Sequence, residues 1–118
     1  MNCQQILITD QKISKEQLEN LCKMWFEDMV KVVVVDVETE KVAIGGELHA
    51  DAEALLIEDG SKSKNIWGAN LYPWHPPYDR IECTALINIR PNYDNPSMEI
   101  LDEGIKAKVE HIVEKICF

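Results

Sequence analysis

"VKVVVVDVE", residues 30–38, sets the architecture that the rest of the chain must fit. It is rich in β-branched residues and too short and too uniformly apolar for an amphipathic helix, so it predicts an interior strand covered on both faces. A polar turn at residues 38–41 comes next, and "VAIGGEL", residues 42–48, predicts the following strand. We therefore expect a hairpin within a sheet that other elements cover.

Two amphipathic helices flank the predicted strands. Residues 14–29 begin with Ser14 and Gln17 at the spacing of a capping box, in which the two side chains satisfy backbone N–H groups of the first turn. Apolar residues then recur at helical spacing: Leu18, Leu21, Cys22, Trp25, Phe26 and Met29. We interpret Trp25 and Phe26 as core residues. Asp102 is placed to cap a second helix with its own apolar stripe: Ile105, Val109, Ile112, Val113 and Ile116.

Further strands are expected on both sides of the hairpin. Residues 6–8 are a short apolar run, and "AEALLIEDG", residues 52–60, and "NIWGANLYP", residues 65–73, each resemble a strand that a Gly or Pro ends. "RIECTALINIRP", residues 80–91, alternates in polarity, which is typical of a half-buried strand. We expect one set of its side chains to face the core: Ile81, Cys83, Ala85, Ile87 and Ile89.

These elements predict one α+β domain, residues 1–118. Its length and its 46% hydrophobic content are normal for a single domain with a real core. Strands clustered between two amphipathic helices predict a mostly antiparallel sheet of four to six strands, with both helices packed on one face. The other face of the sheet would be left to solvent, to a ligand or to a second copy of the chain.

The charge is negative and unevenly distributed. The formal net charge is −9, and Lys and Arg form no run that could follow a phosphate backbone, so we expect no nucleic-acid partner. Between residues 36 and 59, Lys41 is the only cation among eight carboxylates: Asp36, Glu38, Glu40, Glu47, Asp51, Glu53, Glu58 and Asp59. This stretch could attract cations or a basic partner, although a solvated acidic surface is the commoner explanation.

The cysteine pattern and the chain's apolar runs favour the cytoplasm. Cys3, Cys22, Cys83 and Cys117 have none of the spacings that build a zinc site, and Cys22 and Cys83 fall at apolar positions, as expected of free thiols in a reducing cytosol. The N-terminus lacks the basic and apolar regions of a signal peptide. No apolar run is long enough to cross a bilayer, so we expect no membrane association.

The first candidate site is "GGELHADAE", residues 45–53. If it is extended, Glu47, His49, Asp51 and Glu53 project from one side of a strand. Imidazole and carboxylates are the ligand mix of Zn, Mn or Fe sites and also suit general acid/base chemistry. Adjacent same-face residues of a strand lie about 7 Å apart, so chelation would need a bulge or help from another strand. A solvated sheet face is the competing interpretation.

The second candidate site combines the polar face of the strand at residues 80–91 with an aromatic loop. Arg90 ends that strand with a planar fork that could hold a carboxylate or phosphate, or could pair with the surplus carboxylates of residues 36–59. The loop contributes aromatics that either bind a ligand or cover a small core. The candidate binding residues of this surface are Trp67, Asn70, Tyr72, Glu82, Asn88 and Arg90, and the loop also contains Trp74 and His75.

Three segments, "AIGGELHAD", "NIWGANLYP" and "LINIRP", carry a resemblance to a known family. From about residue 29 to residue 100 the chain resembles a small family of bacterial proteins of about this length, which is catalogued as a domain of unknown function. The resemblance implies one cytosolic domain. It transfers no activity, substrate, cofactor or catalytic residue to this chain.

Three hypotheses of function follow from the sequence. The first is a binding or interaction domain, expected to be a homodimer, that uses the exposed polar and aromatic sheet face and requires no cofactor. The second is a metal-assisted hydrolase with His49, Glu47 and Asp51 as ligands or base and Arg90 as anion clamp. The third is an acidic regulatory partner of a basic protein. The chain carries no nucleophile-elbow, P-loop, dinucleotide or zinc-protease motif, and Cys83 is expected to face the core.

Overall fold

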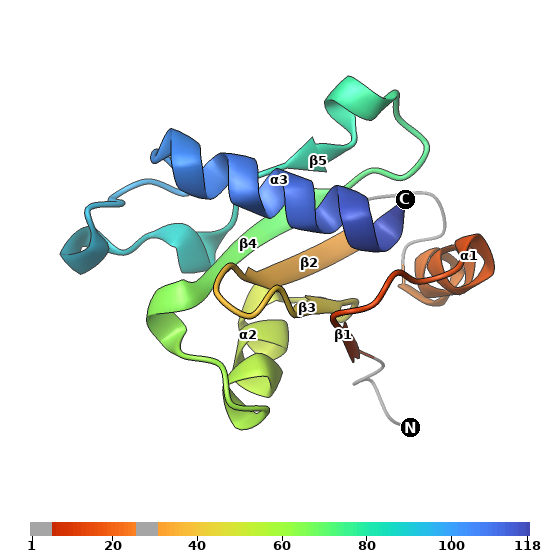
Figure 1. Cartoon of the computed structure of the whole chain (residues 1–118), viewed down its shortest axis with the longest axis horizontal. Helices are drawn as coiled ribbons and strands as arrows, with labels where there is room; N and C mark the ends of the chain where they lie inside the picture. The colour runs from red at the N-terminus through yellow and green to blue at the C-terminus, as the bar shows by residue number, and fades with distance from the viewer. Residues whose placement is uncertain (1–5, 26–30) are drawn as a thin grey trace.

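A five-stranded sheet forms the centre of the computed structural model, which describes residues 6–25 and 31–118 (Figure 1). The strand order is β1-β3-β2-β4-β5, and each neighbouring pair is antiparallel. The strands are β1 (Leu7–Thr9), β2 (Lys31–Asp36), β3 (Val42–Ile44), β4 (Ile66–Leu71) and β5 (Ile81–Glu82). The α+β prediction is confirmed, as are the central hairpin and the strands near residues 6–8 and 65–73.

Strand β2 is buried on both faces, as its sequence predicted. Val33 and Val35 face one apolar cluster and Val32 and Val34 face the other, and all four are at most 5% exposed. Full burial of a valine stabilises a fold by about 1.5 to 3 kcal/mol, so this strand contributes strongly to the core. The turn after β2 is closed by the carboxylate of Asp36, which accepts backbone N–H groups of the next residues.

Helices α1 (Lys15–Trp25) and α3 (Glu103–Cys117) cover one face of the sheet. The capping box of α1 is formed, because Ser14 N donates to Gln17 Oε1 at 2.9 Å and Gln17 N donates to Ser14 Oγ at 3.0 Å. The carboxylate of Asp102 accepts the N–H of Ile105 and caps α3. The core roles expected for Cys22, Trp25, Phe26 and Met29 lie outside the described side chains. No helix of the described residues is long and apolar enough to cross a membrane.

Residues 45–60 do not form strands, so that prediction is wrong. Gly45 and Gly46 have φ of 111° and 81°, and they turn the chain out of β3 into a third helix, α2 (His49–Glu58). This segment is rich in Ala, Leu and Glu, which are good helix formers. Its Ala52 and Leu56, one helical turn apart, are fully buried against the second face of the sheet. The expectation that this face stays open is therefore also wrong.

The strand predicted over residues 80–91 is short. Only Ile81–Glu82 pairs as β5, and the chain then continues through 3₁₀ turns at Leu86–Asn88 and Pro91–Tyr93. The alternation of buried residues holds as far as Ala85, but Ile89 is 44% exposed and Asn88 of the expected polar face is fully buried. The reason is a tertiary contact, since the residues after β5 dock on β4 through the Asn88 side chain and do not extend the strand ladder.

Candidate functional site

The residues of "GGELHADAE" point in different directions. Because α2 begins at His49, Asp51 lies about 200° around the helix from both His49 and Glu53 and cannot share their face, while Glu47 precedes the helix. His49 is half-buried, and its Nε2 donates to the carbonyl of Ala69 at 2.8 Å. Burial lowers the pKa of the His49 imidazole, which favours the neutral ring. Within residues 6–25 and 31–118, no three His, Cys, Asp or Glu side chains are placed to hold a metal ion.

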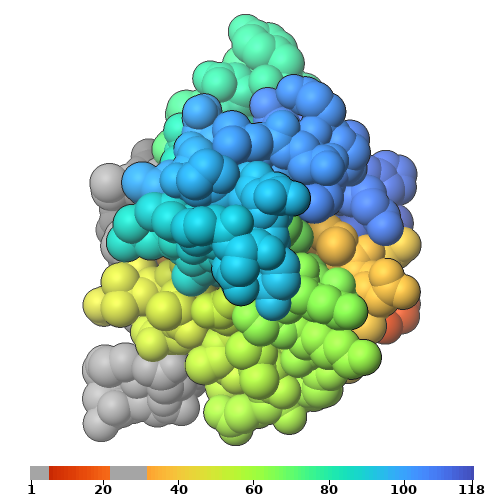
Figure 2. All heavy atoms as spheres, turned by 90° about the vertical axis from the view of Figure 1, so that its left-hand side faces the viewer, coloured from red at the N-terminus to blue at the C-terminus, as the bar shows by residue number. Residues whose placement is uncertain are grey.

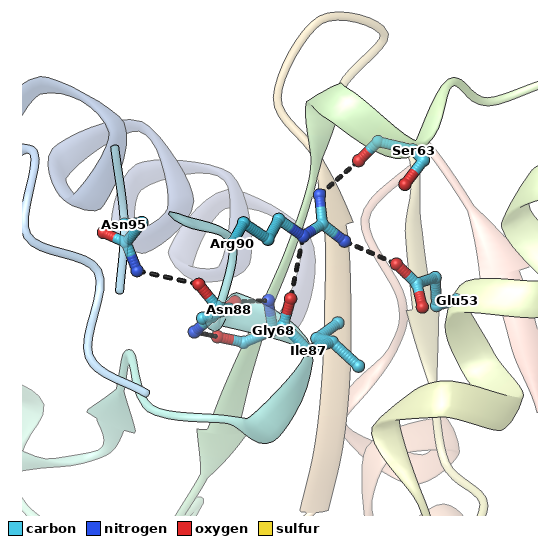
Figure 3. Close-up of polar contacts among 7 residues, drawn as sticks. All are labelled: Glu53, Ser63, Gly68, Ile87, Asn88, Arg90 and Asn95. Carbon is cyan, nitrogen blue, oxygen red and sulfur yellow. Dashed lines mark hydrogen bonds and ion pairs between the residues drawn. The ribbon is translucent and has the colours of Figure 1, made fainter. Parts of the chain in front are cut away.

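Arg90 is buried in a network of its own chain (Figure 3). Its Nε donates to the carbonyl of Ile87 at 2.8 Å, one terminal nitrogen donates to the carbonyl of Ser63, and the other lies 2.5 Å from Glu53 Oε2. All three branches of the guanidinium are thus occupied by internal acceptors. Of the two interpretations of Arg90, the geometry favours pairing with a carboxylate of residues 36–59 over an anion clamp.

Asn88 replaces a strand partner for β4. Its Oδ1 accepts the N–H of Gly68 at 2.8 Å, and its Nδ2 donates to the carbonyl of Gly68 at 3.0 Å (Figure 3). The same Nδ2 donates to the carbonyl of Met98 at 3.0 Å. A side chain at Gly68 would collide with Ala85, because a Cβ there would lie 2.7 Å from the Ala85 Cβ. Asn95 in turn donates to the carbonyl of Asn88 at 2.8 Å. These asparagines anchor residues 85–101 to the sheet and have no donor left for a ligand.

Three of the expected binding residues do come together, at the edge of the sheet. Asn70 Nδ2 donates to Glu82 Oε1 at 3.0 Å, and the hydroxyl of Tyr72 donates to the same oxygen at 3.1 Å. Burial raises the pKa of the Tyr72 hydroxyl, and the nearby charge of Glu82 adds to that effect. Two donors therefore hold the Glu82 carboxylate in one orientation on the surface.

Tyr72 and Glu82 line a cleft of about 650 Å³, here named the β5 cleft. Its lining residues come from the loop at residues 72–80, from β5 and the two residues after it, from residues 99–101 and from the first half of α3. Among the described residues that line it, Lys106 is the single ammonium group, against five carboxylates: Asp79, Glu82, Glu99, Glu103 and Glu110. The cleft is therefore strongly negative over a small volume.

Aromatic rings form the other part of the β5 cleft. Tyr72 and His75 are stacked with ring centroids 4.7 Å apart, and His75 Nδ1 lies 3.5 Å from Asp79 Oδ2. Tyr78 also lines the cleft and is 90% exposed. The other expected aromatics lie elsewhere, since Trp67 is buried at 3% exposure and Trp74 lines a different cavity.

The sequence interpretation missed the contribution of α3 to the β5 cleft. Glu103, Lys106 and Glu110 stand at i, i+3 and i+7, a spacing that places them on one face of the helix and could have been recognised. Glu99 gave no local signal, because it reaches the cleft through an isolated bridge with Thr84.

Much of the acidic stretch at residues 36–59 is used inside the chain. Four of its eight carboxylates accept backbone N–H groups or pair with a Lys or Arg: Asp36, Glu40, Glu53 and Asp59. The acidic surface of this stretch is therefore smaller than its composition suggests.

Residues 7–116 match the model of a family described as "Protein of unknown function (DUF5674)". The chain belongs to this family. The resemblance that the sequence indicated is thereby confirmed, and the match extends beyond residues 29–100 to include α1 and nearly all of α3. No curated protein and no solved structure matches the chain.

Proposed function

We propose that the protein is a non-enzymatic binding domain whose β5 cleft takes an organic cation with more than one ammonium group. One observation supports this most directly: five carboxylates and a single ammonium group line a cleft of about 650 Å³. This volume lies within the range of small-molecule sites. An ammonium group carries three donors and suits carboxylate oxygens, and aromatic faces attract cations as well.

The openness of the cleft to solvent favours a ligand with several charges. Glu82 and Glu99 are exposed, and an exposed ion pair contributes only about 0.2 to 1 kcal/mol. Four such pairs would together give about 1 to 4 kcal/mol, which corresponds to a dissociation constant of about 1 mM at best. A polyamine can make these contacts at once, whereas a simple monoamine cannot. We therefore expect affinity to rise with the number of ammonium groups.

Titration with spermidine, followed by heteronuclear NMR, tests this proposal. The double substitution Glu99→Gln and Glu103→Gln removes two cleft charges and is expected to weaken binding by about twofold to thirtyfold at low ionic strength. The matched control removes two exposed charges elsewhere, by Glu38→Gln and Glu58→Gln. Equal losses in both variants would show that spermidine senses only the net charge, and the proposal would fail.

Self-association is the second candidate, and it rests on a different observation. Four large apolar side chains of residues 86–98 are between 41% and 70% exposed: Leu86, Ile89, Tyr93 and Met98. Figure 2 shows this segment in the middle of one face, between α3 and α2. Contiguous apolar surface on a monomer marks an interaction site. A homodimer would cover these side chains.

Light scattering after size exclusion tests the homodimer. Leu86→Ser combined with Ile89→Ser is expected to give a monomer, whereas Leu48→Ser, at a residue outside residues 86–98 that is 61% exposed, should leave the mass unchanged. A wild-type protein that stays monomeric at high concentration would rule out this candidate.

The cytosolic location expected from the sequence is part of the proposal, and the buried free thiol of Cys83 supports it.

A further inference from the structure

A second cavity, here named the Trp74 pocket, lies on the other side of the loop at residues 72–80. Its volume is about 450 Å³, and it is formed by the chain entering α1, the loop and the C-terminal end of α3. Figure 1 shows the end of α3 near α1. Tyr72 and His75 line the β5 cleft, whereas Pro73 and Trp74 line this pocket, so one loop forms a wall of both.

Six of the ten described residues that line the Trp74 pocket are apolar. Of these, Ile13 and Leu18 are at most 5% exposed, while Trp74 is 48% exposed. The ring of Phe118 completes the wall. A concave apolar site with a few polar groups at its rim is the usual form of a small-molecule site.

Among the described residues that line the Trp74 pocket, the charged side chains are cations. Three of these described residues are Lys or Arg and none of them is Asp or Glu, although the chain has 21 acidic and 12 basic residues. The side chains of this described lining thus carry the opposite sign to the protein as a whole and to the described lining of the β5 cleft. These cations would attract an anion, whereas the net negative charge of the protein repels it.

Arg80 and the two lysines contribute differently to the Trp74 pocket. Arg80 donates from Nε and from a terminal nitrogen to Glu114 at 2.8 and 2.5 Å, and its guanidinium carbon lies 3.6 Å from the ring centroid of Phe118. Its charge is therefore matched by a carboxylate, and it positions the Phe118 ring. Lys12 and Lys15 have no ion pair among the described residues and are exposed at the rim.

We propose that the Trp74 pocket binds a hydrophobic carboxylate. The aryl or alkyl body would lie against Trp74, Phe118 and Leu18, and the carboxylate would face Lys12 and Lys15. This site is separate from the β5 cleft, so it does not depend on the function proposed above.

Naphthoate and its uncharged counterpart naphthalenemethanol are suitable probes. The indole N–H signal of Trp74, identified by its loss in Trp74→Phe, should shift saturably with both compounds. Two exposed ion pairs make the acid bind about threefold to fivefold more tightly than the alcohol. Lys12→Gln with Lys15→Gln should abolish that preference, and the matched pair Lys62→Gln with Lys64→Gln, also exposed, should retain it.

The outcomes separate the parts of the proposal. A preference for the acid that depends on Lys12 and Lys15 supports it. Equal affinity for acid and alcohol, or a preference that the control pair removes as well, overturns the assignment of an anionic ligand. A Trp74 signal that does not shift saturably with either compound overturns the site itself. All four substituted lysines are exposed, and equal thermal unfolding of the variants checks that the fold is retained.

Discussion

Asn88→Ala is expected to lower the free energy of unfolding by about 3 kcal/mol. The amide is fully buried and makes three hydrogen bonds, one from Gly68 N and two to the carbonyls of Gly68 and Met98. A typical hydrogen bond contributes about 1 kcal/mol net, and leaving buried groups without partners adds to the loss. Entry of water into the vacated space would offset part of it, so we expect a range of about 2 to 4 kcal/mol. Native domains are stable by about 5 to 15 kcal/mol, so the variant should still fold.

Urea unfolding followed by tryptophan fluorescence measures this effect as a lower midpoint at unchanged slope. Asn92→Ala, at an exposed asparagine of the same segment, is the matched control and should change stability by less than about 0.5 kcal/mol. Asn88→Asp preserves the size but turns an oxygen toward two carbonyls, so it should destabilise at least as much as Ala. A loss below about 1 kcal/mol for Asn88→Ala would refute the hydrogen-bond reasoning. A folded variant with altered spermidine affinity would refute its purely structural role.

Three further predictions concern buried polar groups. Arg90→Lys cannot replace the three-branched contact and should lower the free energy of unfolding by about 1 to 2 kcal/mol; a wild-type urea midpoint would contradict this. Burial lowers the pKa of His49, so the unfolded state binds more protons than the folded state. The free energy of unfolding should therefore fall as the pH drops below 6.5. Urea unfolding at several pH values should show this fall, and a less steep one in His49→Gln. Burial raises the pKa of Cys83 to about 12, so alkylation mapped by mass spectrometry should modify this thiol only after unfolding; rapid modification of native protein would contradict its burial.

The elements that the sequence predicted well are those with a strong local signal. The β-branched run of β2 has no stable helical alternative, and the capping residues of α1 and α3 satisfy backbone groups only a few residues away. α2 has a weaker signal, because only Ala52 and Leu56 are fully buried and the polar residues around its start alternate along the chain: Glu47, His49, Asp51 and Glu53. The alternation imitated a strand, and the helix propensity of Ala, Leu and Glu determined the outcome.

The candidate site could be predicted only in part. Asn70, Tyr72 and Glu82 were selected for their polar tips, and antiparallel pairing of β4 with β5 brings them together. The sequence pattern did not predict that the carboxylates of α3 join this site, because they follow β5 by about twenty residues or more. A cleft at the edge of a sheet depends on which distant segment packs beside it, and no local pattern records that choice.

Local preferences along the chain thus account for the α+β class, the central hairpin and the capped helices, since the interactions involved span a few residues. The placement of residues 85–101 depends on contacts between distant positions, such as Asn88 with Gly68 and Arg90 with Glu53, which are 20 and 37 residues apart. The alternating pattern of residues 80–91 predicted a strand that would pair with its neighbour through backbone hydrogen bonds. In the structure the buried amide of Asn88 bonds to the backbone of Gly68 in β4 and takes the place of such a strand. Only the folded chain decides such a competition, because the free energy of each alternative includes partners that the segment itself does not contain.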